Sequence, residues 1–169
     1  MTTTTNMKKF SSIQEHRVAD YLNWSVVSGS GARQFDKGDI VSDQFLGECK
    51  THVEKYQKII FYYSHWKKIV EEASSKFKSP VLIVDDGSQS PKNTWCMFNA
   101  SIGLAWNQFE LSQVCPFRTN IIFETSQMKR FLTLLNSDKS YYDKFYLAAR
   151  FGDYDVGVLD LETFALLFN

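Results

Sequence analysis

Cysteine is scarce in this chain of 169 residues. Its 3 cysteines, Cys49, Cys96 and Cys115, show no metal-ligand spacing, and their odd number argues against a disulfide framework. No run approaches the roughly 20 consecutive apolar residues of a membrane span, and no signal peptide is recognisable. Together these absences predict a protein of the reducing cytoplasm that has no membrane partner.

An excess of charge of either sign is also missing. The 19 basic and 19 acidic residues give a net charge of zero, whereas many DNA-binding domains are strongly basic. Neutrality lowers the expectation of tight non-specific DNA binding. It does not exclude an enzyme whose acidic metal ligands are accompanied by a local basic face. The basic residues near the N-terminus are the natural place to look for such a face: Lys8, Lys9, Arg17, Arg33 and Lys37.

What the chain does contain is enough apolar sequence for a core. An apolar content of 44% and a charged content of 22% are ordinary for a folded soluble protein, and the length suits one domain. The threonine-rich stretch from Met1 to Met7 predicts disorder. We therefore expect a disordered tail over residues 1–9 and a single domain over residues 10–169. Residues 88–144 are interpreted as an insertion within the sheet, a lid or a dimer surface.

The stretch from Lys37 to Thr51 predicts a short hairpin. We expect a strand, a turn and a returning strand over residues 39–41, 42–43 and 44–51. Alternation on the returning strand places Glu48, Lys50 and His52 on one face, and Asp39 lies across the hairpin from that face. Two carboxylates and an ammonium group therefore converge beside a sheet edge. A magnesium ion and an attacked phosphate require this combination.

These residues resemble a nuclease signature. Asp39, eight intervening residues and then Glu48-x-Lys50 match the PD-(D/E)xK pattern, with Gly38 in place of its proline. Upstream lie Glu15, in a stretch predicted to be helical, and a loop of small residues from Ser28 to Arg33. The order of these features is similar to that in archaeal and phage Holliday-junction resolvases and their nuclease relatives. The resemblance covers roughly residues 10 to 86.

The resemblance implies a restriction-endonuclease-like α/β fold, in which helices flank a central mixed β-sheet, here with a C-terminal elaboration. It implies a Mg²⁺-dependent enzyme that hydrolyses DNA phosphodiester bonds, with Mn²⁺ as a substitute and branched DNA such as a Holliday junction as substrate. Paired cuts in a junction require two active sites, so a homodimer is expected. The compact size and the threonine-rich start would suit a phage protein that acts in the host cytoplasm.

The resemblance also implies roles for individual residues. Asp39 and Glu48 would bind the metal together with the backbone carbonyl of Cys49. Glu15 would complete the site directly or through water, and Lys50 would orient the attacking water and help to deprotonate it. The implied catalytic set is Glu15, Asp39, Glu48 and Lys50, and the implied DNA-binding residues are Ser28, Gly29, Ser30, Arg33 and Lys37.

Plainer interpretations of the same residues stay open. The segment from Ser12 to Glu15 has capping-box spacing, so Glu15 could simply cap a helix that runs to about Asn23. The charged residues of the hairpin could form an ordinary cross-strand ion pair. The alternative functions are a related nuclease acting on linear, flap or single-stranded DNA, and a catalytically silent module that binds DNA or protein.

The rest of the chain predicts alternating strands and helices. Strands are expected at residues 24–28, 58–62, 81–84, 94–98, 145–151 and 156–159, and helices at residues 65–76 and 161–167. Ser64 and Asp160 are the expected N-caps of these helices. Cys49 and Trp66 are expected to pack in the core. The segment beginning Ile121-Ile122-Phe123 echoes that beginning Ile59-Ile60-Phe61, but the match is too short to indicate duplication.

Overall fold

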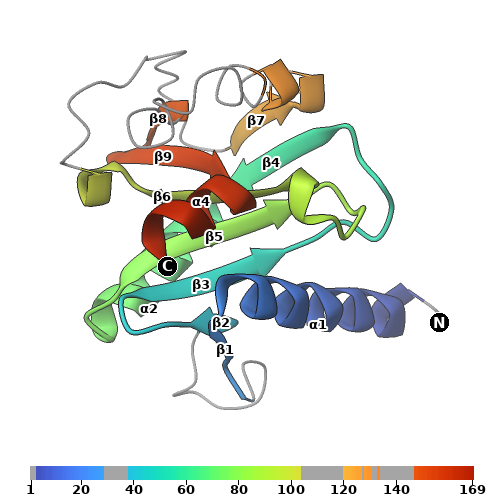
Figure 1. Ribbon diagram of the computed structural model, residues 1–169, viewed down its shortest axis with the longest axis horizontal. Helices are drawn as coiled ribbons and strands as arrows, with labels where there is room; N and C mark the ends of the chain where they lie inside the picture. The colour runs from blue at the N-terminus through green and yellow to red at the C-terminus, as the bar shows by residue number, and fades with distance from the viewer. Residues whose placement is uncertain (1–2, 29–37, 104–119, 127, 131–132, 134–146) are drawn as a thin grey trace.

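The computed structural model describes residues 3–28, 38–103, 120–126, 128–130, 133 and 147–169. Its centre is a seven-stranded sheet with the order β1-β2-β3-β5-β6-β9-β8 (Figure 1). The sheet is mixed, because β3 and β5 run parallel while the other neighbouring strands are antiparallel. In chain order the strands are β1 (Ser25–Val26), β2 (Ile40–Val41), β3 (Phe45–Lys50), β5 (Ser79–Asp85), β6 (Thr94–Asn99), β8 (Leu147–Phe151) and β9 (Tyr154–Asp160).

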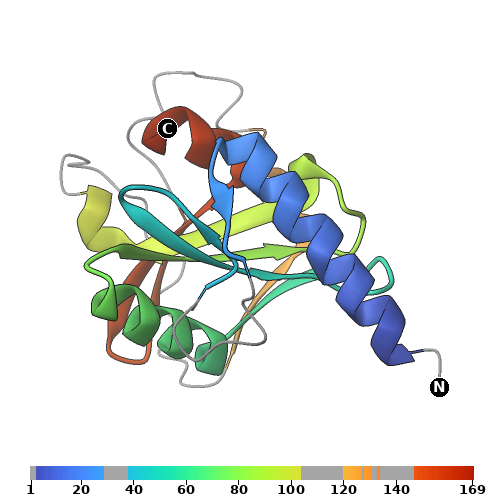
Figure 2. The ribbon, with the colours of Figure 1, turned by 90° about the horizontal axis from the view of Figure 1, so that it is seen from below.

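Helices cover both faces of this sheet. Helix α1 (Thr3–Leu22) and helix α4 (Leu161–Phe168) lie on one face, and helix α2 (Tyr63–Ser75) lies on the other (Figure 2). Val18 of α1 and Phe164 of α4 share one core, whereas Trp66 and Ile69 of α2 belong to a second core. The expectation of an α/β protein with helices flanking a mixed central sheet is confirmed.

Alternation along β3 decides which core each of its residues enters. Phe45 and Cys49 pack beneath α1 and α4, and Leu46 packs beneath α2. Glu48 and Lys50 have the same parity as Leu46, so they lie on the α2 side of the sheet. Cys49 is 3% exposed and Trp66 is fully buried, which confirms the expected packing roles of both residues.

The beginning of the chain differs from the prediction. Residues 3–9 were expected in a disordered tail, and the helix was expected to open at Ser12. Instead α1 is one continuous helix of 20 residues from Thr3. The stretch from Thr3 to Leu22 contains no glycine or proline to interrupt a helix. Helix α1 ends where Asn23 takes a positive φ of 53° and Trp24 N–H donates to the carbonyl of Ala19.

The strand at residues 58–62 also differs in its place. It was expected to extend the central sheet, but β4 (Lys58–Tyr62) pairs antiparallel with β7 (Asn120–Glu124) in a separate two-stranded sheet. Ile60 and Ile122 form the central pair of this register, so the similar segments Ile59–Phe61 and Ile121–Phe123 are hydrogen-bonded neighbours. Residues 125–126 after β7 are helical, as is α2 after β4. Helix α2 begins at Tyr63 without a side-chain cap, so the prediction of Ser64 as N-cap is wrong.

Within the segment 88–144, interpreted as an insertion within the sheet, a lid or a dimer surface, β6 belongs to the central sheet. This strand lies between β5 and β9, and its Trp95, Cys96, Met97 and Phe98 are buried on alternate sides of the sheet. The C-terminal hairpin and helix agree with the prediction. The carboxylate of Asp160 accepts the N–H of Thr163 at 3.1 Å, which confirms the expected N-cap of α4.

Candidate functional site

The β2–β3 hairpin brings Asp39 beside Glu48. Asp39 N–H donates to the carbonyl of Gly47 at 2.8 Å, and its Oδ2 accepts the N–H of Cys49, also at 2.8 Å. These two contacts fix both the backbone and the carboxylate of Asp39 against β3. Gly47 is needed for this close approach, since a Cβ there would lie 2.7 Å from Cγ1 of Ile40.

Glu48 is held by two lysines. Lys50 Nζ lies 2.7 Å from its Oε1. Lys68 Nζ donates to Oε1 at 2.9 Å and to Oε2 at 3.0 Å. Lys50 comes from the same strand, as predicted, but Lys68 comes from α2 and was not predicted as a site residue. The Glu48 side chain is only 4% exposed, so these ammonium groups replace most of its contact with water.

The two carboxylates have opposite electrostatic environments. Burial, followed by the neighbouring charge of Glu48, raises the pKa of Asp39 to about 6. Burial alone would also raise the pKa of Glu48, but Lys50 and Lys68 together lower it below its usual value. Two carboxyl groups with separated pKa values in one place are typical of functional sites.

Glu15 belongs to the same charged group. It is half-buried on α1, where burial raises its pKa and the charge of Lys50 opposes that rise. Its charge in turn contributes to the raised pKa of Asp39. Because α1 begins at Thr3, Glu15 lies inside the helix and does not cap it, so the capping alternative is wrong. Next to it, Gln14 Nε2 donates to the carbonyl of Lys50 at 2.8 Å and ties α1 to β3.

Helix α2 closes the other side of the site. Glu72 is buried, accepts the N–H of Gly38 at 3.1 Å and lies 3.9 Å from Nζ of Lys68. Near the N-terminal end of α2, burial, followed by the charge of Lys50, lowers the pKa of His65. Helical spacing predicts that Ser64, Lys68 and Glu72 share one face of the helix. It does not predict that this face packs against Glu48, so the sequence carried no signal for Lys68 as a site residue.

Gly38 departs from the proline of the PD-(D/E)xK pattern for a structural reason. Its φ is +80°, which proline cannot adopt, and its N–H is the donor to Glu72. We expect Gly38→Pro to lower the free energy of unfolding by about 2–3 kcal/mol, because it combines backbone strain with the loss of a charge-assisted hydrogen bond.

Urea unfolding of Gly38→Pro and Gly38→Ala separates these two causes. The alanine variant keeps the N–H that donates to Glu72, but alanine does not tolerate the positive φ as glycine does. Its Cβ would also lie 2.7 Å from Cδ1 of Leu46. It should therefore lose less stability than the proline variant. A Gly38→Pro protein as stable as the wild type would show that neither the positive φ nor the Glu72 contact matters.

The donor set fits a hard divalent cation in part. The carboxylates of Asp39 and Glu48 and the carbonyl of Cys49 are oxygen ligands of the kind that Mg²⁺ prefers, and the raised pKa of Asp39 has burial as its main cause, followed by the charge of Glu48. Within the described residues, however, no three His, Cys, Asp or Glu side chains form a ready metal-binding group. A cation at Glu48 would also have to share that carboxylate with the two lysines.

The predicted DNA-binding loop can be followed only at its start. Ser28 is exposed just after β1, whereas Gly29, Ser30, Arg33 and Lys37 lie outside the described residues. Lys8 and Lys9 are exposed on α1. Arg17 does not belong to a free basic face, since its side chain is 18% exposed and pairs with Asp85 at 2.9 Å.

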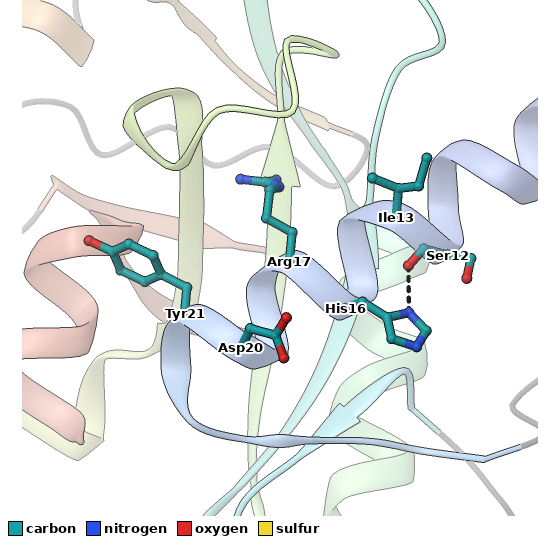
Figure 3. Close-up of a pocket in the computed structure, with 6 residues that line it drawn as sticks. All are labelled: Ser12, Ile13, His16, Arg17, Asp20 and Tyr21. Carbon is teal, nitrogen blue, oxygen red and sulfur yellow. Dashed lines mark hydrogen bonds between the residues drawn. The ribbon is translucent and has the colours of Figure 1, made fainter.

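A surface hollow of about 700 Å³ lies along α1, and none of the four predicted catalytic residues lines it (Figure 3). It is lined by Ser12, Ile13, His16, Arg17, Asp20 and Tyr21. Figure 3 shows the Arg17 and His16 side chains pointing in different directions, and the ring of His16 is bonded to the carbonyl of Ser12 at 2.8 Å. The hollow therefore offers no converging set of polar groups, and the hairpin cluster remains the candidate site.

In the part of the chain that the structure describes, no helix has both the length and the apolar character needed to cross a membrane. Comparisons with models of known protein families, with curated proteins and with solved structures found no significant match to this chain.

Proposed function

We propose that this protein is a Mg²⁺-dependent endonuclease that hydrolyses phosphodiester bonds in DNA. The observation that carries the proposal is the convergence of Asp39, Glu48 and Lys50 on one hairpin, with Glu15 within electrostatic reach on α1. The mixed sheet flanked by helices is compatible with the restriction-endonuclease-like class that the sequence resembles. Fold alone does not fix an activity, so the proposal depends on the site.

In the proposed reaction each residue of the hairpin cluster has a separate role. Asp39, Glu48 and the Cys49 carbonyl would hold the cation, with Glu15 beside them. When bound, Mg²⁺ supplies Lewis acidity toward a phosphate oxygen and lowers the pKa of bound water. Lys50, as an ammonium paired with Glu48, would orient the attacking water, and its charge would help that water to lose a proton to solvent by stabilising the hydroxide that forms. The hydroxide oxygen would form the new bond to phosphorus as the bond to the 3′ oxygen breaks, and the leaving oxygen would take a proton from solvent, which gives a 5′-phosphate and a 3′-hydroxyl.

The proposed substrate is branched DNA, most specifically a four-way junction. This step rests on the resemblance to junction resolvases. Resolution needs two symmetric cuts, so the active form would be a homodimer with one site from each chain. A neutral net charge suits an enzyme that depends on DNA structure more than on non-specific attraction to the backbone.

A cleavage assay tests the proposal. The purified protein is incubated with labelled four-way junction, linear duplex, flap and single-stranded DNA, with Mg²⁺, with Mn²⁺ and with EDTA. Paired symmetric nicks in the junction, dependent on the metal, are expected. Glu48→Gln should reduce the rate on the order of 10²–10³-fold. Glu71→Gln is the matched control, because Glu71 is exposed on α2 and pairs with Lys67 at 3.8 Å.

The outcomes separate the candidate functions. Equal cleavage of all substrates, lost in Glu48→Gln, would keep the active site and remove the junction preference. The absence of cleavage with either metal on every substrate would contradict the nuclease proposal. It would favour the catalytically silent binding module, a candidate supported by one observation: both oxygens of Glu48 are already occupied by lysines.

A further inference from the structure

Lys68 covers both oxygens of the Glu48 carboxylate. Its ammonium donates hydrogen bonds to Oε1 at 2.9 Å and to Oε2 at 3.0 Å, and Lys50 Nζ lies 2.7 Å from Oε1. A divalent cation bound by Glu48 would have to be coordinated by at least one of the same two oxygens. Lys68 therefore stands where a metal ion bound to Glu48 would need to be, or directly against it.

The Lys68 side chain is also free to leave. It is 52% exposed, while the Glu48 side chain that it covers is only 4% exposed. Glu72 lies one turn further along α2, with Oε1 at 3.9 Å from Nζ of Lys68. The exposed Lys68 side chain could therefore swing from Glu48 toward solvent or toward Glu72, whereas Glu48 is fixed within β3.

We propose that Lys68 is an internal competitor of the divalent cation: it neutralises Glu48 in the metal-free protein and is displaced when the cation binds. The inference deepens the proposed function and rests on it, since it assumes a cation at Glu48. It also gives the displaced ammonium a second position. Once released from Glu48, Lys68 lies at the mouth of the site with its charge free for the phosphate of the DNA backbone.

The competition has a measurable consequence for metal affinity. In Lys68→Met the cation no longer has to displace an ammonium, so we expect Mg²⁺ and Mn²⁺ to bind about tenfold more tightly, the scale of one charge-assisted hydrogen bond. Lys67→Met is the matched control, since it removes the same charge from the neighbouring position, where Nζ pairs with the exposed Glu71. Its affinity should change by less than about threefold. Lys68→Arg keeps the competing charge and should not bind metal more tightly than the wild type.

Isothermal titration of the wild type and of Lys68→Met, Lys67→Met, Lys68→Arg and Glu48→Gln with each metal decides the proposal, with thermal melts to confirm that each variant is folded. Equal affinities of Lys68→Met and Lys67→Met, with Glu48→Gln abolishing binding, would overturn the competition and leave the metal site intact. Absence of metal binding to the wild type and to Lys68→Met would overturn the competition together with the metal-dependent function. Binding to Lys68→Met alone would support the competition in its strongest form.

A second measurement on the wild type needs no substitution. Acetylation of lysine side chains, followed by mass spectrometry, reports how accessible each ammonium is. With EDTA, Lys68 should react more slowly than Lys67, because it is bound to Glu48. Saturating Mg²⁺ should raise the rate at Lys68 several-fold and leave Lys67 unchanged. An unchanged rate at Lys68 in protein that has bound Mg²⁺ would contradict displacement.

Discussion

Arg17→Met should lower the free energy of unfolding by about 3–5 kcal/mol, because it leaves the buried carboxylate of Asp85 without its cation. Asp85 is fully buried, and its Oδ2 accepts from Arg17 at 2.9 Å. Its Oδ1 accepts from Thr51 at 2.5 Å and from the N–H of Gly87 at 2.8 Å. Burial outweighs these contacts and raises the pKa of Asp85, so the carboxylate depends on every partner that it has.

Urea unfolding at pH 7 measures this effect, and a second arginine provides the control. Arg150 pairs with Asp155 at 3.6 Å, but both side chains are more than half exposed. Arg150→Met should therefore cost less than about 1 kcal/mol. The double variant Arg17→Met/Asp85→Asn should recover part of the loss, because it removes the unpaired charge. A loss at Arg17 no larger than that at Arg150 would show that the buried pair contributes no more than an exposed one.

The Arg17 pair also has a role in placing the candidate site. Arg17 joins α1 to the ends of β5 and β6 through Asp85 and Thr94. Glu15 lies on the same helix, half a turn away, and Gln14 binds the end of β3. A helix loosened by Arg17→Met would carry Glu15 away from Asp39 and Glu48. We therefore infer that stability and the geometry of the site are linked through α1.

The hairpin was predictable because its contacts are local. Alternation assigned the faces of β3 correctly, and the turn at Ser42-Asp43 brought Asp39 to Cys49 across ten positions of sequence. The apolar stripe of α2 was predictable for the same reason, since helical periodicity is a property of neighbouring residues. These local patterns placed three of the charged residues together, and the resemblance to nucleases made them candidates for a site.

Contacts between distant elements were not predictable in this way. Lys68 reaches Glu48 across 20 positions and Arg17 reaches Asp85 across 68. No periodicity or spacing indicates which helix face will meet which strand. Arg17 was grouped with exposed basic residues, because its sequence neighbours do not reveal a carboxylate at the end of a remote strand. The pairing of β4 with β7 was missed for the same reason, although the two segments had been noted as similar.

Asp39→Asn is the substitution with opposite expected effects on stability and activity. The pKa of Asp39 is about 6, against an ordinary value of 3.8. Ionisation of Asp39 is therefore less favourable in the folded protein than in the unfolded chain. Its contribution to stability is fully present below pH 3.8 and is lost as the pH rises through about 6. At pH 8 the neutral amide that Asp39→Asn introduces would avoid this cost and still accept the N–H of Cys49.

We therefore expect Asp39→Asn to be more stable than the wild type by about 2–3 kcal/mol at pH 8 in EDTA, and to lose this advantage near pH 4. It should also lose metal-dependent cleavage on the order of 10²–10³-fold. Urea unfolding at pH 4, 6 and 8, with Asp43→Asn as an exposed control on the same hairpin, measures the first effect.

Mg²⁺ should stabilise the wild type and not Asp39→Asn, because a bound cation relieves the same charge that the amide removes. A variant less stable than the wild type at pH 8 would mean that the carboxylate is required by the fold itself. The combination of higher stability and lost cleavage would instead mean that Asp39 is kept charged for function at the expense of stability.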